Sequence, residues 1–291
     1  MAPEAGRRRR AWIVASAVAF LSVALPGLWG FVIEPASLRN EDHEIALPGW
    51  PEACTGLRVA VLGDLHVGSP WNDPKKLGDI VALTNAARPD LILLAGDYVI
   101  HGVVGGRFEP PEAIAATLRG LHAPIGVYAV LGNHDWWLDA ARVRRSLESV
   151  SIPVLEDRAL PLAKGACRFW LAGISDWMEG PHDVAHALEA VSDAGPVMVF
   201  THNPDVFPEI PARVAITIAA HTHGGQVHLP GIGRPIVPSV YGERFAIGHV
   251  VEDGRHLFVS SGLGTSILPV RFRVPPEVSV LTLRSTPRRG A

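Results

Sequence analysis

Cysteine is scarce in this sequence, which contains only Cys54 and Cys167. The two lack the C-x-x-C spacing of thiolate metal sites, and no histidine stands at zinc-finger spacing from them. A cysteine-ligated zinc or iron–sulfur centre is therefore excluded. The simpler interpretation is two unrelated thiols, and the alternative is a single disulfide in a domain that lies outside the cytoplasm.

Positive charge is also in short supply. Lysine and arginine number 26 against 29 aspartates and glutamates, which gives a formal net charge of -3. A protein that coats nucleic acid needs a basic surface to meet the phosphates, so nucleic acid is not an expected partner. Charged residues amount to only 19% of the chain, and part of that shortfall comes from one uncharged stretch near the N-terminus.

The uncharged stretch predicts a membrane segment. Residues 1–10 form a basic segment that includes four consecutive arginines, and residues 11–33 carry no charge. At ~1.5 Å per residue, a helix of that length covers the ~30 Å hydrocarbon core of a bilayer. Trp12 and Trp29 stand near its two ends, where tryptophan favours the membrane interface. We therefore predict one N-terminal transmembrane helix that anchors the chain.

The arginines also predict an orientation. Because they precede the apolar run, they favour a cytoplasmic N-terminus, so the chain is expected to be a single-pass protein of the cell membrane with its catalytic body outside the cytoplasm. A cleaved secretory signal or a twin-arginine export signal has a similar pattern, and the body would then be exported after cleavage. A third alternative is a buried core helix. No small-x-small site follows the apolar run, which favours the uncleaved anchor.

Beyond residue 57, short apolar runs end abruptly in polar residues. The runs that we predict as strands are 57–62, 91–95, 126–131, 197–200 and 215–219. Helix-compatible stretches lie at 75–87, 111–121, 140–149 and 183–192. Strands that alternate with helices predict a layered α/β fold, in which ligands bind beyond the carboxyl ends of the strands. The tail from 227 to 283 shows short strands without long helices, which we assign to a second sheet of the same domain.

Metal-binding side chains follow each of the five predicted strands. Asp64 and His66 are one residue apart, so an extended segment would point both side chains the same way. The seven candidate ligands are Asp64, His66, Asp97, Asn133, His202, His221 and His223. Nitrogen and oxygen donors in this number suit two divalent or mixed-valence ions, with Mn, Fe or Zn as candidates and Asp97 as the bridge.

The residues next to Asn133 are the candidates for catalysis. Two metal ions ~3.5–4 Å apart can hold both sides of a displacement at phosphorus and supply the attacking hydroxide. His134 has no obvious place among the ligands, so we predict that it protonates the leaving oxygen or stabilises phosphoryl charge. Asp135 is the second candidate, because it could orient His134 by accepting the other ring N–H.

Five short motifs carry a family resemblance. They are GDLH at 63–66, GD at 96–97, GNHD at 132–135, HN at 202–203 and HTHGGQ at 221–226. In this order they resemble the calcineurin-like metallophosphoesterase family, and the N-terminal segment with the stretch 260–283 is similar to its membrane-associated bacterial branch of predicted phosphohydrolases. The resemblance implies a four-layer α/β/β/α sandwich, here over residues 44–285. It implies one ion on Asp64, His66, Asp97 and His223, and the other on Asp97, Asn133, His202 and His221.

These features predict a dinuclear metal-dependent phosphohydrolase, either a phosphodiesterase or a phosphomonoesterase, that acts on a cell-envelope or lipid-linked phosphoester. A UDP-2,3-diacylglucosamine hydrolase-like pyrophosphatase of lipid A synthesis is an alternative, although its cytoplasmic substrate conflicts with the predicted topology. A metal-dependent nuclease and a non-catalytic binding module are weaker alternatives. Candidate phosphate contacts are Arg244, Arg271 and Arg273. Candidate aromatic walls of the cleft are Trp71, Trp136, Trp137 and Trp177.

Overall fold

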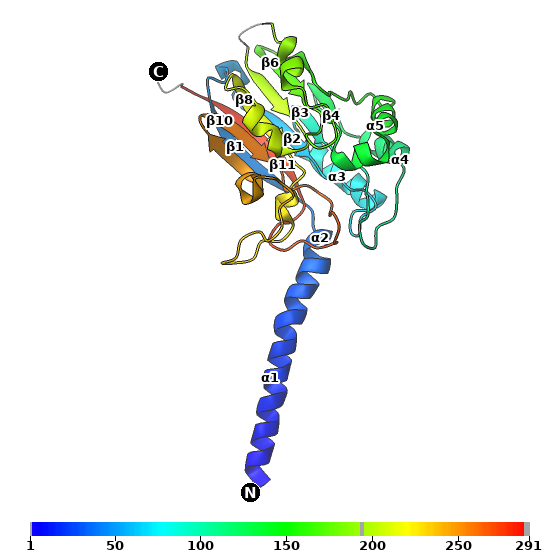
Figure 1. Ribbon diagram of the computed structural model, residues 1–291, viewed down its shortest axis with the longest axis vertical. Helices are drawn as coiled ribbons and strands as arrows, with labels where there is room; N and C mark the ends of the chain where they lie inside the picture. Colours follow the sequence, from blue (N-terminus) through cyan, green and yellow to red (C-terminus); the bar gives the residue numbers. More distant parts are fainter. Residues whose placement is uncertain (1, 193–194, 288–291) are drawn as a thin grey trace.

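A long N-terminal helix leads into a body built from two packed β-sheets (Figure 1). The computed structural model describes residues 2–192 and 195–287. Met1, the first residue of the predicted basic segment, lies outside them. The helix projects away from the body, whose elements gather around the sheets at its C-terminal end (Figure 1).

The first sheet has the strand order β1-β11-β2-β3-β4. Its strands are β1 (Arg39–Pro48), β2 (Leu57–Leu62), β3 (Leu91–Ala95), β4 (Gly126–Val130) and β11 (Glu277–Thr286). The neighbours β2, β3 and β4 run parallel, which requires crossover connections between them. Two helices lie in these connections, α3 (Pro74–Ala86) and α4 (Pro111–Leu118), and α5 (Asn133–Glu148) follows β4. The Asp73 side chain caps α3 by accepting the backbone N–H of Lys76 at 2.8 Å.

The second sheet has the order β5-β6-β7-β8-β10-β9. Its strands are β5 (Arg158–Lys164), β6 (Cys167–Gly173), β7 (Val197–Phe200), β8 (Val214–Ala219), β9 (Gly248–Glu252) and β10 (Arg255–Val259). The strands β6, β7, β8 and β10 run parallel to one another. On its outer face lie α6 (Val184–Glu189) and the 3-10 segment η3 (Pro204–Glu209).

Alternate side chains of each strand enter different cores, as the two-residue period of a strand requires. Val59 and Val61 of β2 pack toward the second sheet, where they join Phe200 of β7. Ala60 and Leu62 of the same strand pack beneath the helices. A third core lies between the second sheet and its own helical cover. The predicted four-layer α/β/β/α arrangement is confirmed.

Two details of the chain path differ from the sequence prediction. The tail contributes β9 and β10 to the second sheet, as predicted, but its last strand, β11, pairs with β1 and β2 in the first sheet. The strands β1, β5 and β6 were not predicted, and β1 begins at Arg39, ahead of residue 44. The sequence of β1 is rich in charged residues, and most of its side chains are partly or fully exposed, so it lacks the apolar run that marks a buried strand.

The two cysteines are joined. Cys54 lies in the short segment η2 (Glu52–Cys54), Cys167 begins β6, and their Cα atoms are 4.6 Å apart across a disulfide bond. The interpretation of two unrelated thiols is therefore wrong. The bond ties the connection between β1 and β2 to the second sheet, so it links the two halves of the sandwich.

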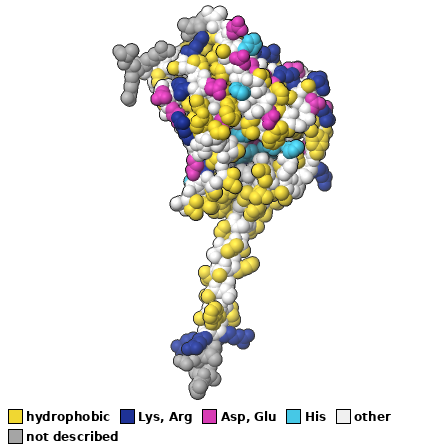
Figure 2. Space-filling model, in the orientation of Figure 1, with side chains coloured by type: hydrophobic (Ala, Val, Ile, Leu, Met, Phe, Trp, Pro, Cys, Tyr) yellow, Lys and Arg dark blue, Asp and Glu magenta, His cyan; other side chains and the backbone are white. Residues whose placement is uncertain are grey.

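The N-terminal helix runs as α1 (Ala2–Leu28), continues through the π-helical turn η1 (Trp29–Ile33) and ends with α2 (Glu34–Ala36). The helix is thus longer than the predicted 11–33. Residues 7–36 are long and apolar enough to cross a membrane, and their most apolar window packs against no other part of the chain. Hydrophobic side chains line the projecting stem, and arginines lie near its free end (Figure 2).

Candidate metal centre

The candidate ligands meet at the ends of parallel strands. Asp64 follows β2, Asp97 follows β3, and Asn133 begins α5 just after β4. On the second sheet, His202 follows β7 and His221 follows β8. The carboxyl ends of these strands face each other across the sandwich, so side chains far apart in the sequence converge. None of the seven is more than 7% exposed.

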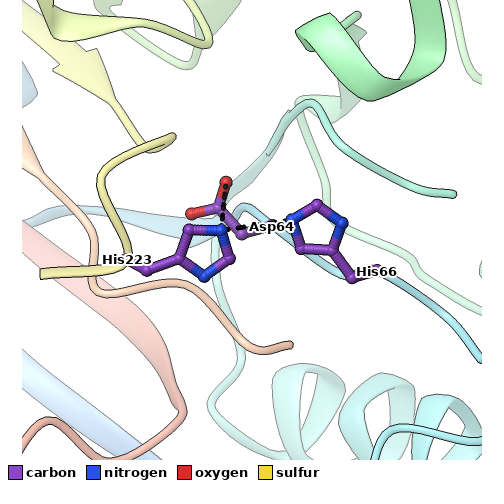
Figure 3. Close-up of side chains that lie close together, drawn as sticks. All are labelled: Asp64, His66 and His223. Carbon is purple, nitrogen blue, oxygen red and sulfur yellow. Dashed lines mark hydrogen bonds and ion pairs between the residues drawn. The ribbon is translucent and has the colours of Figure 1, made fainter. Parts of the chain in front are cut away.

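One half of the cluster contains Asp64, His66 and His223, which point toward one another from two separate segments (Figure 3). The Nε2 atoms of His66 and His223 are 3.1 Å apart. The Nε2 atom of His223 lies 3.8 Å from Oδ1 of Asp64. The Nδ1–H of His66 donates to the carbonyl oxygen of Val99 at 3.1 Å, so its Nε2 presents a lone pair to the centre of the cluster.

The other half is organised around His202. Its Nδ1–H donates to the carbonyl oxygen of Ala95 at 2.7 Å, so Nε2 is the ring nitrogen that faces the cluster. That Nε2 lies 3.1 Å from Nδ1 of His221 and 3.2 Å from Oδ1 of Asn133. The backbone bond to Ala95 thus fixes both the tautomer and the orientation of the ring, as the outer partners of metal-binding histidines commonly do.

Asp97 joins the two halves. Its Oδ2 lies 3.4 Å from Nε2 of His66 and 3.4 Å from Nε2 of His202. Its other oxygen, Oδ1, accepts the backbone N–H of His134 at 2.9 Å. One carboxylate oxygen therefore faces both halves, which is the position that a bridging ligand of two cations requires.

The arrangement of lone pairs fits a pair of cations. Nε2 of His202 faces the oxygens of Asn133 and Asp97, and such a group of electron pairs repels unless a positive charge, either a proton or a metal cation, lies between them. Oδ2 of Asp64 is buried and has no hydrogen-bond partner within the described part of the chain, although a buried carboxylate oxygen normally has one. Imidazole, carboxylate and amide donors without thiolate suit Mn, Fe or Zn.

The protonation equilibria agree with this interpretation. Burial lowers the pKa of His66 and of His221 to about 3, so both rings are neutral near pH 7 and can donate lone pairs. Burial raises the pKa of Asp64 to about 7, because nothing in the chain compensates its charge fully. At His202 burial opposes protonation, but the carboxylates of Asp97, Asp64 and Asp176 raise its pKa to about 10, so a proton on Nε2 takes the place beside these carboxylates that a metal cation would otherwise fill. The group of carboxylates thus attracts a cation strongly.

Backbone strain marks the same residues. Five of the seven candidate ligands have a positive φ: Asp64 (52°), His66 (40°), Asp97 (57°), His221 (69°) and His223 (51°). Left-handed backbone is uncommon outside glycine and costs roughly 1 kcal/mol or more per residue. The extended segment predicted for Asp64 and His66 is therefore wrong, since tight loops rather than strand alternation aim these side chains. Strain concentrated in this way is typical of a functional site.

Two glycines allow the loops to approach so closely. A Cβ on Gly132 would overlap the Asp97 carboxylate, and a Cβ on Gly96 would lie 2.6 Å from the backbone nitrogen of Gly132 and 2.8 Å from Nδ1 of His202. Gly96 also has a φ of 87°. Any side chain at either position would displace the bridging carboxylate or His202.

His134 stands at the rim of the cluster. Its Nε2 lies 3.9 Å from Oδ2 of Asp97, and its ring contacts His66 edge-on at 4.6 Å between centroids. Trp137 packs on the ring at 4.8 Å between centroids. Nδ1 of His134 is buried without a partner among the described residues. The ring is thus next to the cluster yet free to hydrogen-bond an added molecule.

Asp135 does not orient His134 as the sequence suggested. Its carboxylate instead accepts four backbone N–H groups, from Asp97 at 2.8 Å, Tyr98 at 3.0 Å, Val99 at 3.4 Å and Gly132 at 2.9 Å. The side chain therefore ties the loop after β3 to the loop after β4. Its contribution to the site is to position the Asp97 loop rather than to contact a reacting group.

Arg271, Arg244 and Trp71 have hydrogen-bond partners outside the cluster. Arg271 is completely buried and bonds backbone carbonyls, so it is not a phosphate contact. Arg244 pairs with Glu252 on the surface. Trp71 bonds Phe31 at the end of the N-terminal helix. Among the four tryptophans considered, Trp137 is the one that contacts His134.

His101 is a neighbour of the site that the sequence did not single out. It is exposed, and its ring lies 6.3 Å from His134 and 5.7 Å from Trp137, centroid to centroid. Its only signal was its position shortly after Asp97, in the loop that follows β3. His101 and Trp137 form an aromatic wall beside His134.

Comparison with known proteins gives one family. The family model for calcineurin-like phosphoesterases matches residues 57–225. The uncharacterized metallophosphoesterase YkuE of Bacillus subtilis is 30% identical over 87% of this chain and 88% of its own length. The phosphodiesterase YaeI of Escherichia coli is 30% identical over 94% of this chain and 98% of its own. The UDP-2,3-diacylglucosamine pyrophosphatase LpxG of Chlamydia trachomatis is 25% identical over 92% of this chain and 96% of its own.

Proposed function

This chain belongs to the calcineurin-like phosphoesterase family, and from that premise we propose that it is a dinuclear metal-dependent phosphodiesterase of the cell envelope. Membership makes it a hydrolase of phosphoester bonds, as its motifs predicted. The number of metals, the preference for diesters and the lipid-linked substrate are our proposal. The observation that carries it is the single carboxylate oxygen of Asp97, which lies 3.4 Å from one histidine of each half of the cluster.

We assign the ligands as two sets that share Asp97. One cation would be held by Asp64, His66, Asp97 and His223, and the other by Asp97, Asn133, His202 and His221. Two such cations supply charge neutralisation at phosphorus and an activated water. The protein contributes fixed donors, because the carbonyl oxygens of Val99 and Ala95 hold the rings of His66 and His202 in place.

His134 takes the leaving group in this proposal. Its Nε2 faces the cluster, and its Nδ1 has no partner in the described chain. Burial lowers its pKa, and a dianionic or monoanionic phosphate placed against the ring would favour its protonated form. A proton held there can pass to the departing oxygen, and the imidazolium can stabilise phosphoryl charge before it does.

The apolar helix is proposed as an uncleaved anchor that leaves the body outside the cytoplasm. Four arginines at the free end of the helix favour the cytoplasmic side for that end. The Cys54–Cys167 disulfide supports an oxidising location for the body, because such bonds are rare in the cytoplasm. A phosphodiester in the outer leaflet or the wall would then be within reach of the site.

A second candidate comes from one relative. LpxG is described as a UDP-2,3-diacylglucosamine pyrophosphatase, and its similarity covers nearly the whole of both chains. A sugar-nucleotide lipid of that kind would also present a phosphoanhydride to the metal centre. The disulfide and the arginines indicate that the body lies outside the cytoplasm, where the sugar-nucleotide lipid would also have to be. They therefore favour the first candidate, the phosphodiesterase of the cell envelope.

The test begins with the full chain purified in detergent, stripped of metal and reloaded separately with Mn, Fe or Zn. Turnover of bis-(p-nitrophenyl) phosphate above that of p-nitrophenyl phosphate is expected, which separates a diesterase from a monoesterase. Hydrolysis of a UDP-linked acylated sugar at a higher kcat/KM than either would favour the second candidate. Metal content, measured by elemental analysis, is expected to be two ions per chain.

Two substitutions separate metal binding from catalysis. Asp97→Ala should lose both metal and turnover, because it removes the shared oxygen. His134→Ala should keep its metal and lose roughly 10²–10⁴-fold in kcat, the range typical of general acid catalysis. The matched controls are Asp42→Ala and His122→Ala, both on exposed side chains away from the cluster. Full turnover in metal-loaded Asp97→Ala would refute the proposal.

A further inference from the structure

Four loops surround the point where the N-terminal helix enters the body. They comprise residues 67–72, 99–108, 227–241 and 262–272, and we call them the collar loops. Trp71 Nε1 donates to the carbonyl oxygen of Phe31 at 2.8 Å, and the backbone N–H of Arg271 donates to Gly30 at 2.8 Å. Two of the loops are thus bonded directly to the last turns of the helix.

The other two loops are bonded to these. The backbone N–H of Val104 donates to the carbonyl of Ile267 at 2.9 Å, and that of His228 donates to Phe272 at 2.9 Å. Lys76 fastens the helix end from the side of α3, because its Nζ donates to the carbonyls of Pro35 and Ser37 at 2.9 Å each. The collar loops and the helix end therefore form one connected structure.

Large apolar side chains of the collar loops point into solvent. Their exposed fractions are Trp71 42%, Val104 57%, Ile232 72%, Ile236 76%, Ile267 68% and Leu268 47%. Figure 2 shows hydrophobic side chains across the base of the body, between the stem and a hollow in which histidines are visible. Exposed isoleucine in this number on one face of a soluble surface would be costly, and such faces mark a contact with a partner or a membrane.

The charges of the collar loops are one-sided. None of the four segments contains aspartate or glutamate. The segments do contain arginine, and Arg107 is exposed, as is Arg273 immediately after the last segment. The nearest carboxylates, Asp73 and Glu109, stand directly after the first two segments. An apolar surface whose own segments carry arginine and no carboxylate complements an anionic lipid surface, which repels carboxylates and attracts arginine.

We propose that the collar loops lie in the interfacial layer of the membrane that holds α1, so that the body rests on the bilayer instead of swinging freely above it. This inference rests on the membrane anchoring proposed above and not on the identity of the substrate. The partner is a lipid surface, because the collar loops are bonded to the end of a helix that is itself apolar enough to span a membrane. A bilayer that holds the helix must meet this surface.

Contact of the collar loops with the bilayer would bring the metal centre close to the membrane. The loop that carries Ile267 is also bonded to the loop of the candidate ligand Asp64, because the backbone N–H of Gly264 donates to the carbonyl of Asp64 at 2.6 Å. The hollow with histidines lies on the side of the body that adjoins the collar loops (Figure 2). Phosphoesters at the depth of lipid head groups would therefore be presented directly to the site.

The test uses the full chain with single cysteine substitutions, labelled with a nitroxide and reconstituted into vesicles of phosphatidylcholine and phosphatidylglycerol. Ile232→Cys, Ile236→Cys and Ile267→Cys report on the collar loops, and Val18→Cys reports on the exposed face of the helix. Val251→Cys is the matched control, because Val251 is 53% exposed on β9, away from the helix. Accessibility of each label to oxygen and to a water-soluble nickel complex gives its depth. Thermal midpoints within a few degrees of the parent protein show that each variant folds.

Collar labels and Val18→Cys should favour oxygen, with at least several-fold less nickel contact than Val251→Cys. A helix label in lipid together with collar labels as open to nickel as Val251→Cys would overturn the seating while leaving the anchor intact. A helix label in water would overturn both. Collar labels that are shielded and show spin–spin broadening would identify a second copy of the chain as the occupant and also overturn the proposal. None of these outcomes depends on phosphoesterase turnover.

Discussion

Arg271→Met tests how a buried side chain supports the metal centre without touching it. The Arg271 side chain is fully buried, and burial lowers its pKa to about 10, so it remains charged near neutral pH. Its Nε and Nη2 donate to the carbonyl of Gly264 at 3.0 and 2.6 Å, Nη1 donates to Val274 at 2.9 Å, and Nη2 donates to Ser261 at 2.9 Å. Methionine would fill much of the volume with no donors.

The magnitude follows from the groups left behind. Three buried carbonyl oxygens lose a charged donor, and each unsatisfied group costs ~1–3 kcal/mol. Removal of the guanidinium also removes the free-energy cost of burying its charge, and this offsets part of that sum. We expect a net loss of ~3–5 kcal/mol, which corresponds to a fall of roughly 6–20 °C in the thermal midpoint of a domain of this size.

Arg271→Met should also weaken metal binding. The Arg271 side chain holds the loop that contains Gly262 and Gly264, and this loop packs directly on Asp64, where a Cβ on Gly262 would lie 2.5 Å from Oδ2. Loosening it would free Asp64 to move. Removal of such supporting residues typically weakens metal binding ~10–100-fold, so chelator titration should strip the variant at lower concentrations.

Two further variants sharpen the result. Arg273→Met removes an exposed arginine two residues away and should change the midpoint by no more than about 1 °C, since isolated surface charges contribute little. Arg271→Lys keeps the charge with fewer and shorter-reaching donors and should recover only part of the stability. If Arg271→Met melted with the parent protein and kept its metal as tightly, the supporting role argued here would be refuted.

Three other outcomes are expected. Replacement of both cysteines by serine should cost ~4–5 kcal/mol in denaturant unfolding, because the bond closes a sequence separation of 113 residues; a loss below ~1 kcal/mol would contradict this. Asp135→Asn should lower stability by ~2–4 kcal/mol and increase metal loss on dialysis, because four backbone N–H groups bond the two oxygens of Asp135 and asparagine keeps only one acceptor oxygen; unchanged metal retention would argue against its positioning of the Asp97 loop. Burial raises the pKa of Glu156 from 4.5 to about 7, so its contribution to stability is full below pH 4.5 and is lost as the pH rises through 7; Glu156→Gln should flatten the unfolding free energy between pH 5 and 8, and an unchanged slope would place the titration elsewhere.

Local patterns of residues are enough to predict the chemistry of the site and the plan of the fold. Asp97 and His202 follow short apolar runs, and such runs are local patterns whose strand period and abrupt polar ends can be read without a structure. The converging ends of parallel strands then predict that these side chains meet. The uncharged segment 11–33 predicted the projecting helix in the same way, because membrane length and apolarity are local properties.

The tertiary structure alone decided how those side chains are held. The Asp135 carboxylate accepts backbone N–H groups of the loop after β3, Arg271 donates to backbone carbonyl oxygens, and Cys54 meets Cys167 across the sandwich. Every residue type offers the same backbone atoms, so bonds to them leave no signature in the sequence of the partner. The placement of β11 in the first sheet is non-local in the same sense, since strand pairing depends on a register with β2 that lies more than two hundred residues away. Local patterns therefore specified which atoms could bind metal, and long-range backbone contacts specified where they are.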